Sequence, residues 1–473
     1  MAEHVLPTVI QGGMGVAVSS WPLARAVAAT GQLGVVSGTA LDLVLARRLE
    51  DGDPDGSTRR ALSHFPDQAM AQRLLDKYFV EGGRPADRPY RPVPKMSLPL
   101  TKAVQELAIV GNFVEVWLAK EGHDGPIGIN YLEKIQLVTP ASALGAMLAG
   151  VDYVLMGAGI PREIPQLLNN LAAGLPGGVT IEVQGSDTSH RIEIDPAHAL
   201  RVPLPPLKRP LFLAIVSAAV LATYLARDDS TRPDGYIIEG HVAGGHNAPP
   251  RGPVVLNDHN EPTYGPRDDV DLAKIAALGL PFWLAGSYST PERVREAQEL
   301  GAAGVQVGTL FALSNESGFS DDLRTQVRDR IAHDNLTVLT DGKASPTGFP
   351  FKVAQLPETL SEPDVYDARE RVCDLGILRT AYITPKGDIG YRCPSEPVHM
   401  YVKKGGDIED TVGRQCLCNA LAANVGKGQL RRGGYIEPPL VTLGSSLDGA
   451  AELVRMHPNG WTAADVVHWL LDA

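Results

Sequence analysis

The sequence predicts an α/β protein built on a (β/α)8 TIM barrel, with a helical insertion after the second strand and an additional C-terminal region. Eight short apolar runs rich in Val, Ile and Gly alternate with helical stretches over roughly the first 310 residues. The runs are continuously apolar, which is typical of parallel strands covered on both faces. Most end in Gly, Ser, Asn or Thr and lead into a helix. Such strands close into a barrel whose chemistry lies at their C-terminal ends.

The eight predicted strands share this apolar pattern and a small or polar residue at the end. They are Val5–Gln11, Leu33–Gly38, Pro126–Leu132, Tyr153–Gly159, Leu211–Ser217, Gly235–Gly240, Phe282–Ser287 and Gly304–Thr309. The fifth lies in Pro210–Ala226, a segment of 17 uncharged residues. Because ~20 residues are needed to cross a bilayer, we expect a buried strand feeding a helix here, and no membrane span.

Two stretches interrupt the repeat within residues 1–315, which we assign to the barrel. Residues 57–125 are too long for one crossover and have a helical pattern. Residues 176–209 contain alternating VTIEV and RIEI segments around a Gly-Ser-Asp turn, which predicts a β-hairpin.

The regular alternation stops at about residue 312. We therefore predict that residues 316–473 are an elaboration packed on the barrel, ending in an amphipathic helix over Thr462–Leu471. The role of residues 370–473 stays open.

Composition restricts the class of protein. The 473 residues include 43 Lys and Arg against 55 Asp and Glu, a net charge of −12, which argues against a general nucleic-acid binder. Four Cys are too few for a disulfide scaffold, and the N-terminus lacks a basic region followed by an apolar stretch. We expect a cytoplasmic protein with a small-molecule substrate and no nucleic-acid or membrane partner. A homo-oligomer stays open.

The first motif is Gln11–Gly15 (QGGMG), at the end of the first strand. Glycines allow backbone N–H groups to approach a ligand closely, and a helix follows. A dinucleotide-binding turn would need a carboxylate after the next strand, but that strand ends in Val36–Thr39 without one. An ordinary tight turn is the other alternative.

The second motif is Glu239–Asn247 (EGHVAGGHN), after the sixth strand. Gly244 and Gly245 leave backbone amides free, and His246 follows them in the predicted barrel mouth. Histidine titrates near neutral pH and can act as a general base. The alternative is a histidine that only bonds a loop. His241 is assigned a structural or supporting role.

The third motif joins two neighbouring strand ends, where Gly286 and Ser287 follow the seventh strand and Gly308 and Thr309 follow the eighth. Many barrels bind phosphate at this position, although ordinary turns would look similar. Asn130 closes the third strand, either as a turn residue or as a hydrogen-bond partner of a ring.

The cysteines are Cys373, Cys393, Cys416 and Cys418. The Cys416-x-Cys418 spacing differs from that of a typical zinc knuckle, so we predict buried thiols and no metal site. The Pro-rich segment 248–266 is either a lid or a surface loop.

Together these motifs resemble the flavin-dependent nitronate monooxygenases, whose fold is shared by flavin-dependent enoyl-acyl-carrier-protein reductases. QGGMG, AGGH and GVQVGT carry the resemblance. It implies FMN in the barrel mouth and an active-site histidine at His246. The implied FMN contacts are Gly13, Met14 and Asn130 at the ring, Gly15 in the same turn, and Gly244, Gly245, Gly286, Ser287, Gly308 and Thr309 at the phosphate.

The resemblance leaves three functions open. The favoured one is oxidation of an alkyl nitronate by O2 through FMN, with His246 deprotonating a neutral nitroalkane or holding the nitro group. In the second, NAD(P)H reduces FMN, which reduces an enoyl thioester or a quinone, in connection with fatty-acid or polyketide synthesis. In the third, the protein is a flavin-binding scaffold whose C-terminal region docks a partner.

Overall fold

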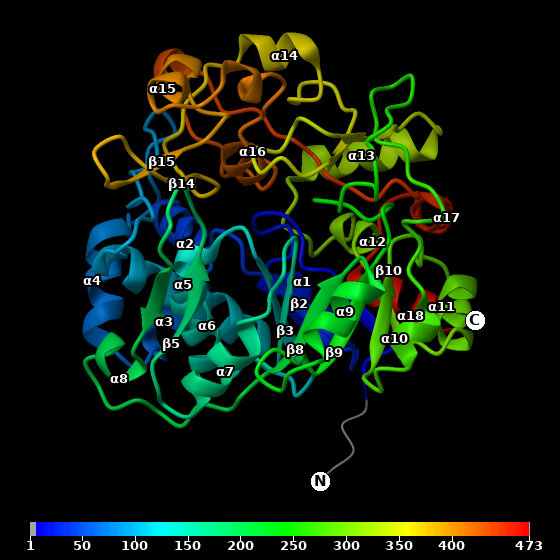
Figure 1. Ribbon diagram of the computed structural model, residues 1–473, viewed down its shortest axis with the longest axis horizontal. Coiled ribbons are helices and arrows are strands. Elements are labelled where there is room, and N and C mark those ends of the chain that lie inside the picture. Colours follow the sequence, from blue (N-terminus) through cyan, green and yellow to red (C-terminus); the bar gives the residue numbers. More distant parts are fainter. Residues whose placement is uncertain (1–5, 473) are drawn as a thin grey trace.

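The computed structural model describes residues 6–472, and its centre is an eight-stranded parallel barrel (Figure 1). Each predicted run contains one strand, so the predicted TIM barrel is confirmed; Val5, the start of the first run, lies outside the described residues. The barrel strands are β1 (Val9–Gln11), β2 (Gly34–Ser37), β3 (Ile127–Leu132), β4 (Tyr153–Gly157), β8 (Leu211–Val216), β9 (Gly235–Glu239), β10 (Phe282–Ala285) and β11 (Gly304–Val307).

The strands are hydrogen-bonded in the order β1-β11-β10-β9-β8-β4-β3-β2. A parallel bridge between Ile10 and Leu33 closes the ring, since Gln11 N donates to Leu33 O at 3.0 Å and Leu33 N donates to Val9 O at 3.1 Å. Inward side chains fill the lower barrel, where the Trp283 indole donates to Pro7 O at 2.7 Å. The barrel is therefore a packed core with room for a ligand only at its C-terminal mouth.

Helices surround the strands. They are α1 (Trp21–Ala28), α2 (Leu41–Glu50), α5 (Lys102–Lys120), α6 (Thr139–Leu148), α7 (Ile164–Ala172), α9 (Ala219–Leu225), α10 (Leu272–Ala276), α11 (Pro291–Glu299) and the short α12 (Thr309–Ala312). The apolar segment Pro210–Ala226 is β8 followed by α9, as predicted. Among the helices of residues 6–472, none has the length and apolarity to cross a membrane.

The predicted helical insertion contains α3 (Ser57–Ser63) and α4 (Gln68–Tyr78) before α5. Because α5 contacts α1, α2 and α6, it belongs to the outer helical layer of the barrel. The predicted hairpin is also present: β5 (Gly177–Ile181) pairs antiparallel with β7 (His190–Ile194).

Between them, β6 (Val183–Gln184) pairs with β14 (Thr380–Ile383) of the C-terminal region. This pairing joins the hairpin segment, residues 176–209, to the C-terminal region. The short α8 (Pro196–Ala199) follows β7.

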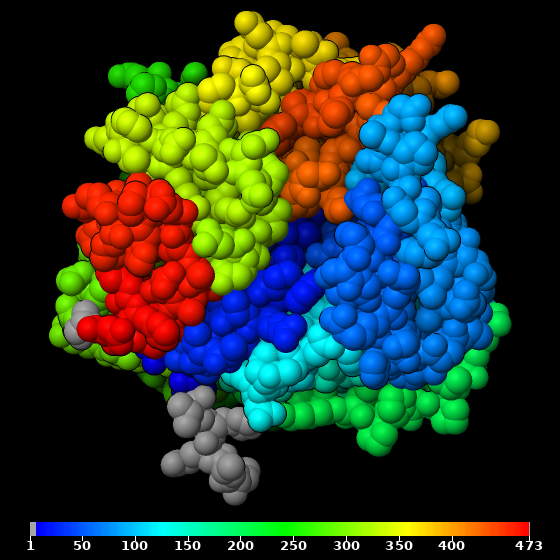
Figure 2. Space-filling view, turned by 180° about the vertical axis from the view of Figure 1, so that it is seen from behind, coloured from blue at the N-terminus to red at the C-terminus, as the bar shows by residue number. Residues whose placement is uncertain are grey.

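The C-terminal region lies over the barrel mouth and then returns to the barrel side (Figure 1). Its last helix, α18 (Ala463–Leu471), contacts both α1 and α11. Figure 2 shows this from behind, with the red C-terminal end against the dark blue N-terminal segment. The other elements are α13 (Asp321–Ala332), β12 (Val338–Asp341), β13 (Phe351–Ala354), α14 (Pro363–Ala368), β15 (Ile389–Arg392), α15 (Val398–Lys403), α16 (Leu417–Ala423), α17 (Asp448–Met456) and α18 (Ala463–Leu471).

Candidate active site

A cavity of about 250 Å³ opens at the C-terminal ends of the barrel strands. All eleven residues selected from the sequence line it: Gly13, Met14, Gly15, Asn130, Gly244, Gly245, His246, Gly286, Ser287, Gly308 and Thr309. Residues of the C-terminal region complete the lining, which the sequence did not predict. They include the apolar side chains of Phe351, Ile377, Leu378, Leu417 and Leu421.

The first glycine turn is fixed against Asn130. A Cβ added to Gly13 would lie 2.4 Å from Asn130 Cβ, so this approach requires glycine. The Asn130 amide donates to Gly13 O at 3.0 Å, while its buried Oδ1 has no hydrogen-bond partner within residues 6–472. Met14 N donates to Ser19 Oγ at 2.9 Å, which holds the turn from below.

Gln306 supplies a second buried oxygen without a partner. Its Oε1 is unpaired in the described part of the chain, and the residue lines the cavity from β11. Buried acceptors are normally satisfied, so two unpaired ones in a cavity fit a ligand that presents N–H groups. Gln306 was missed, although it lies within the GVQVGT motif.

His246 is held by the C-terminal region. Its Nε2 lies 2.7 Å from Ser345 Oγ, and its ring meets the Phe351 ring edge-on at 4.8 Å. Burial, with a smaller effect of the Lys134 charge, lowers the pKa of His246 to about 4. The imidazole is therefore neutral at pH 7 and a weak base, which favours a role in holding the substrate over proton abstraction.

Glu239 is a functional candidate that the sequence reasoning missed, since it was noted only as the first residue of the second motif. It ends β9 and lines the cavity. Removal from water raises the pKa of its carboxyl from 4.5 to about 7. Ala285 lies between Glu239 and Gln306 in register, and its small side chain leaves space between the two polar groups. Its position could have identified it from the sequence, because a carboxyl at the C-terminal end of a barrel strand is a candidate for a functional role.

The predicted phosphate corner includes a segment from near the chain's end, residues 442–446. Gly245 N donates to Thr442 Oγ1 at 2.8 Å, and Gly444 N donates to Thr309 Oγ1 at 3.0 Å. Gly286 adopts φ +84°, and Ser287 follows at φ +67°. The Gly245 amide, predicted to be free, therefore already has a protein partner, as does the Thr309 hydroxyl, predicted to face a phosphate. Gly444 and Ser446 add to the lining.

His241 and the Pro-rich segment 248–266 lie outside this lining. His241 stacks on Tyr264 at 4.4 Å, consistent with the supporting role assigned to it. The Pro-rich segment folds back on itself, with the Tyr264 hydroxyl donating to Ala248 O at 2.9 Å. Within residues 6–472, no group of three or more His, Cys, Asp or Glu side chains is arranged to hold a metal ion.

No protein-family model matches the chain. Nitronate monooxygenase of Pseudomonas aeruginosa is 32% identical over 153 residues, 31% of this chain and 42% of that enzyme. The chain is similar to nitronate monooxygenases, as its motifs predicted.

A second relative is (3aS,4S,5R,7aS)-5-hydroxy-7a-methyl-1-oxo-octahydro-1H-indene-4-carboxyl-CoA dehydrogenase of Rhodococcus jostii. It is 27% identical over 169 residues, 34% of this chain and 43% of the relative. Each of these two matches thus spans less than half the length of this chain and less than half the length of the relative. Among solved structures, FabK of Thermotoga maritima matches with a TM-score of 0.48 and 16% identity, over 99% of this chain and 92% of that one.

Proposed function

We propose that this protein is an FMN-dependent oxidoreductase that oxidises alkyl nitronates with O2 in the barrel cavity. The observation that carries the proposal is the convergence of the glycine turns after β1, β9, β10 and β11 on one cavity at the barrel mouth. The motifs in these turns are those that resemble nitronate monooxygenases. When bound, FMN would take electrons from the substrate and pass them to oxygen.

The cavity residues fit a flavin. The unpaired oxygens of Asn130 and Gln306 suit the N–H groups of a flat heterocycle. Gly13 allows the first turn to lie directly against Asn130, and the corner at Gly286 and Gly308 faces the same cavity. Val36–Thr39, at the end of β2, contains no carboxylate to hold an adenosine ribose, so the mononucleotide FMN is favoured over a dinucleotide.

We assign His246 to substrate orientation. A neutral imidazole whose Nε2 meets Ser345 leaves its other ring nitrogen to hold an oxygen of the nitronate group. A substrate that arrives as the anion has already lost its carbon-bound proton. The low pKa of His246 is therefore no obstacle, because no proton has to be removed. The apolar side chains of Phe351 and Leu378 would contact the alkyl part.

The test begins with the purified full-length protein. Denaturation should release FMN, and FAD or no flavin after reconstitution would contradict the proposal. Oxygen uptake is then measured with a preformed nitronate and with the corresponding neutral nitroalkane, without nicotinamide. We expect uptake with the nitronate and at least tenfold less with the nitroalkane. No uptake with either would refute the activity.

A second candidate is hydride transfer involving an acyl thioester. It is favoured by the similarity to the indene-4-carboxyl-CoA dehydrogenase of Rhodococcus jostii. Anaerobic mixing with NADPH decides between the two, because rapid bleaching of the flavin supports the reductase. Bound flavin without turnover in either assay would favour the scaffold alternative.

A further inference from the structure

The four cysteines of the chain gather beside the candidate active site. Cys373, Cys393, Cys416 and Cys418 come from three separate segments and line one small cavity. Cys418 also lines the barrel cavity. The thiol cluster, defined as these four residues, therefore shares a wall with the space proposed for the flavin.

The thiols form two interacting pairs. Cys373 interacts with Cys393, and Cys416 interacts with Cys418, through side-chain hydrogen bonds. The hydrogen bond from Cys418, opposed by burial but assisted by the Arg369 charge, lowers the pKa of Cys416 to about 6. This shift favours the thiolate form of Cys416, which is the form that reacts with oxidants.

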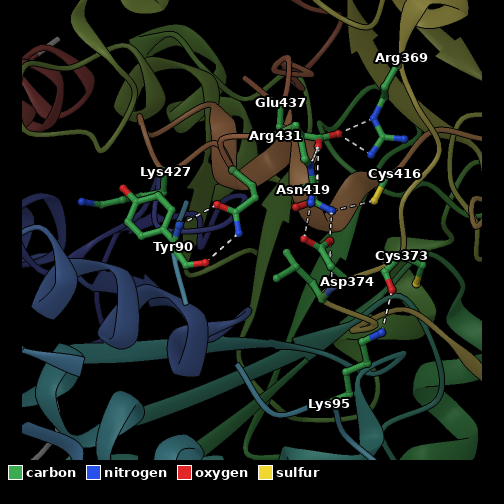
Figure 3. Close-up of polar contacts among 12 residues, drawn as sticks. Tyr90, Lys95, Arg369, Cys373, Asp374, Cys416, Asn419, Lys427, Arg431 and Glu437 are labelled. Carbon is green, nitrogen blue, oxygen red and sulfur yellow. Dashed lines mark hydrogen bonds and ion pairs between the residues drawn. The ribbon is translucent and has the colours of Figure 1, made fainter. Parts of the chain in front are cut away.

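The polar surroundings of Cys416 are firmly held (Figure 3). The Asn419 amide donates to Cys416 Sγ at 3.5 Å and to Asp374 Oδ1 at 2.8 Å. Arg369 is buried in an ion pair with Glu437. Since Cys416 itself is only 7% exposed, a small neutral oxidant has better access to it than a bulky disulfide.

We propose that the thiol cluster is a redox-active site in which hydrogen peroxide oxidises Cys416 and a second thiol of the cluster completes a disulfide. The source of peroxide rests on the proposed function, because a reduced flavin that reacts with O2 can release peroxide into the adjoining cavity. The thiol cluster is then the site at which peroxide released by that side reaction oxidises the protein.

The chemistry proceeds in two balanced steps. The Cys416 thiolate attacks one oxygen of hydrogen peroxide, the O–O bond breaks, and a sulfenic acid forms with hydroxide, which takes up a proton to become water. The sulfur of a neighbouring thiol then attacks the sulfenic sulfur, forming the S–S bond and releasing a second water. Two thiols are oxidised, and one peroxide is reduced.

The experiment uses the full-length protein, with and without FMN, reduced and then freed of reductant without oxygen. One set of samples receives hydrogen peroxide and, after its removal, an alkylating reagent in denaturant, so that every remaining thiol reacts. Peptide masses then map the alkylated thiols and any disulfide. A second set receives dimedone, which traps sulfenic acid. We expect two of the four thiols to become unavailable, in a disulfide that contains Cys416.

Two variants sharpen the result. Cys416→Ser should slow thiol loss at least tenfold. Cys393→Ser is the matched control, a buried thiol of the other pair whose removal leaves Arg369 and Asn419 in place; dimedone should still label Cys416 in it.

Four alkylatable thiols after peroxide, or thiol loss unchanged in Cys416→Ser, would overturn the proposal. So would stoichiometric zinc or iron held by these cysteines in the purified protein. Because the peroxide is added, the readout stands even where nitronate oxidation fails, and the two proposals fail separately.

Discussion

Replacement of Glu239 by Gln tests whether the carboxyl at the end of β9 is destabilised by its surroundings. In the unfolded chain a glutamate has a pKa of 4.5, whereas burial raises the pKa of Glu239 to about 7. Between these values the folded protein binds the proton more tightly than the unfolded chain, so folding loses stability as the pH rises from 4.5 to 7. Above pH 7 the folded protein bears the full cost in folding free energy of keeping the charged Glu239 carboxylate buried.

The difference in pKa corresponds to about 3 kcal/mol. The Glu239 residue is only half-buried and lines an open cavity, so solvent screening reduces the expected penalty to about 1–2 kcal/mol. Gln has the same shape and no charge. In flavin-free protein, Glu239→Gln should therefore raise the unfolding temperature by about 1–2 °C at pH 8, for a chain of this length, and by less at pH 5.

The assay is thermal unfolding at pH 5 and pH 8. Glu81→Gln is the control, because Glu81 is an exposed glutamate in the turn after α4, and its gain at pH 8 should stay below that of Glu239→Gln. An equal gain for Glu239→Gln at both pH values, or a loss at pH 8, would refute the argument that desolvation raises this pKa.

Three further predictions concern the cavity and its support. Gly13→Ala should lower the flavin content of the purified protein at least tenfold, measured by absorbance, because its Cβ would meet Asn130 Cβ at 2.4 Å; unchanged content would remove this turn from the flavin site. His246→Asn should retain flavin and lower kcat/KM for the nitronate. Because the pKa of His246 lies at about 4, the dependence of kcat/KM on pH around pH 6.5 should be the same in the variant as in the original protein. A loss of activity confined to the neutral nitroalkane would restore the general-base role. Trp461→Ala should cost about 3–5 kcal/mol in denaturant unfolding, because the indole is fully buried and donates to Leu310 O at 2.9 Å; a cost below about 1 kcal/mol would show that α18 docks weakly.

The barrel could be predicted because its strands are buried on both faces. This burial produces continuous apolar runs such as Leu211–Ser217, and a closed parallel barrel brings all strand ends to one rim. A residue at the end of a predicted strand could therefore be placed at the barrel mouth. The predicted residues Asn130 and His246 line one cavity although 116 positions separate them in the sequence.

The surroundings of those residues could not be predicted in the same way. The partner of His246, Ser345, lies 99 residues further along the chain, and that of Gly245, Thr442, lies 197 residues away. Neither segment has a periodic pattern that would place it over the mouth. Without these contacts, the burial that lowers the pKa of His246 and raises that of Glu239 could not be inferred, so His246 looked like an ordinary base.

The C-terminal region contributes to the barrel as well as to the site. Residues 442–446 complete the corner at Gly245 and Thr309, α17 follows, and α18 then packs beside α1 and α11. The helix directly after β11, α12, has only four residues, and α18 lies beside α1 and α11, where the outer helix of the eighth strand would pack. One stretch near the end of the chain thus lines the ligand cavity and also covers the junction between the first and last strands. Folding of the predicted barrel unit and completion of its candidate site are therefore coupled through residues 442–471.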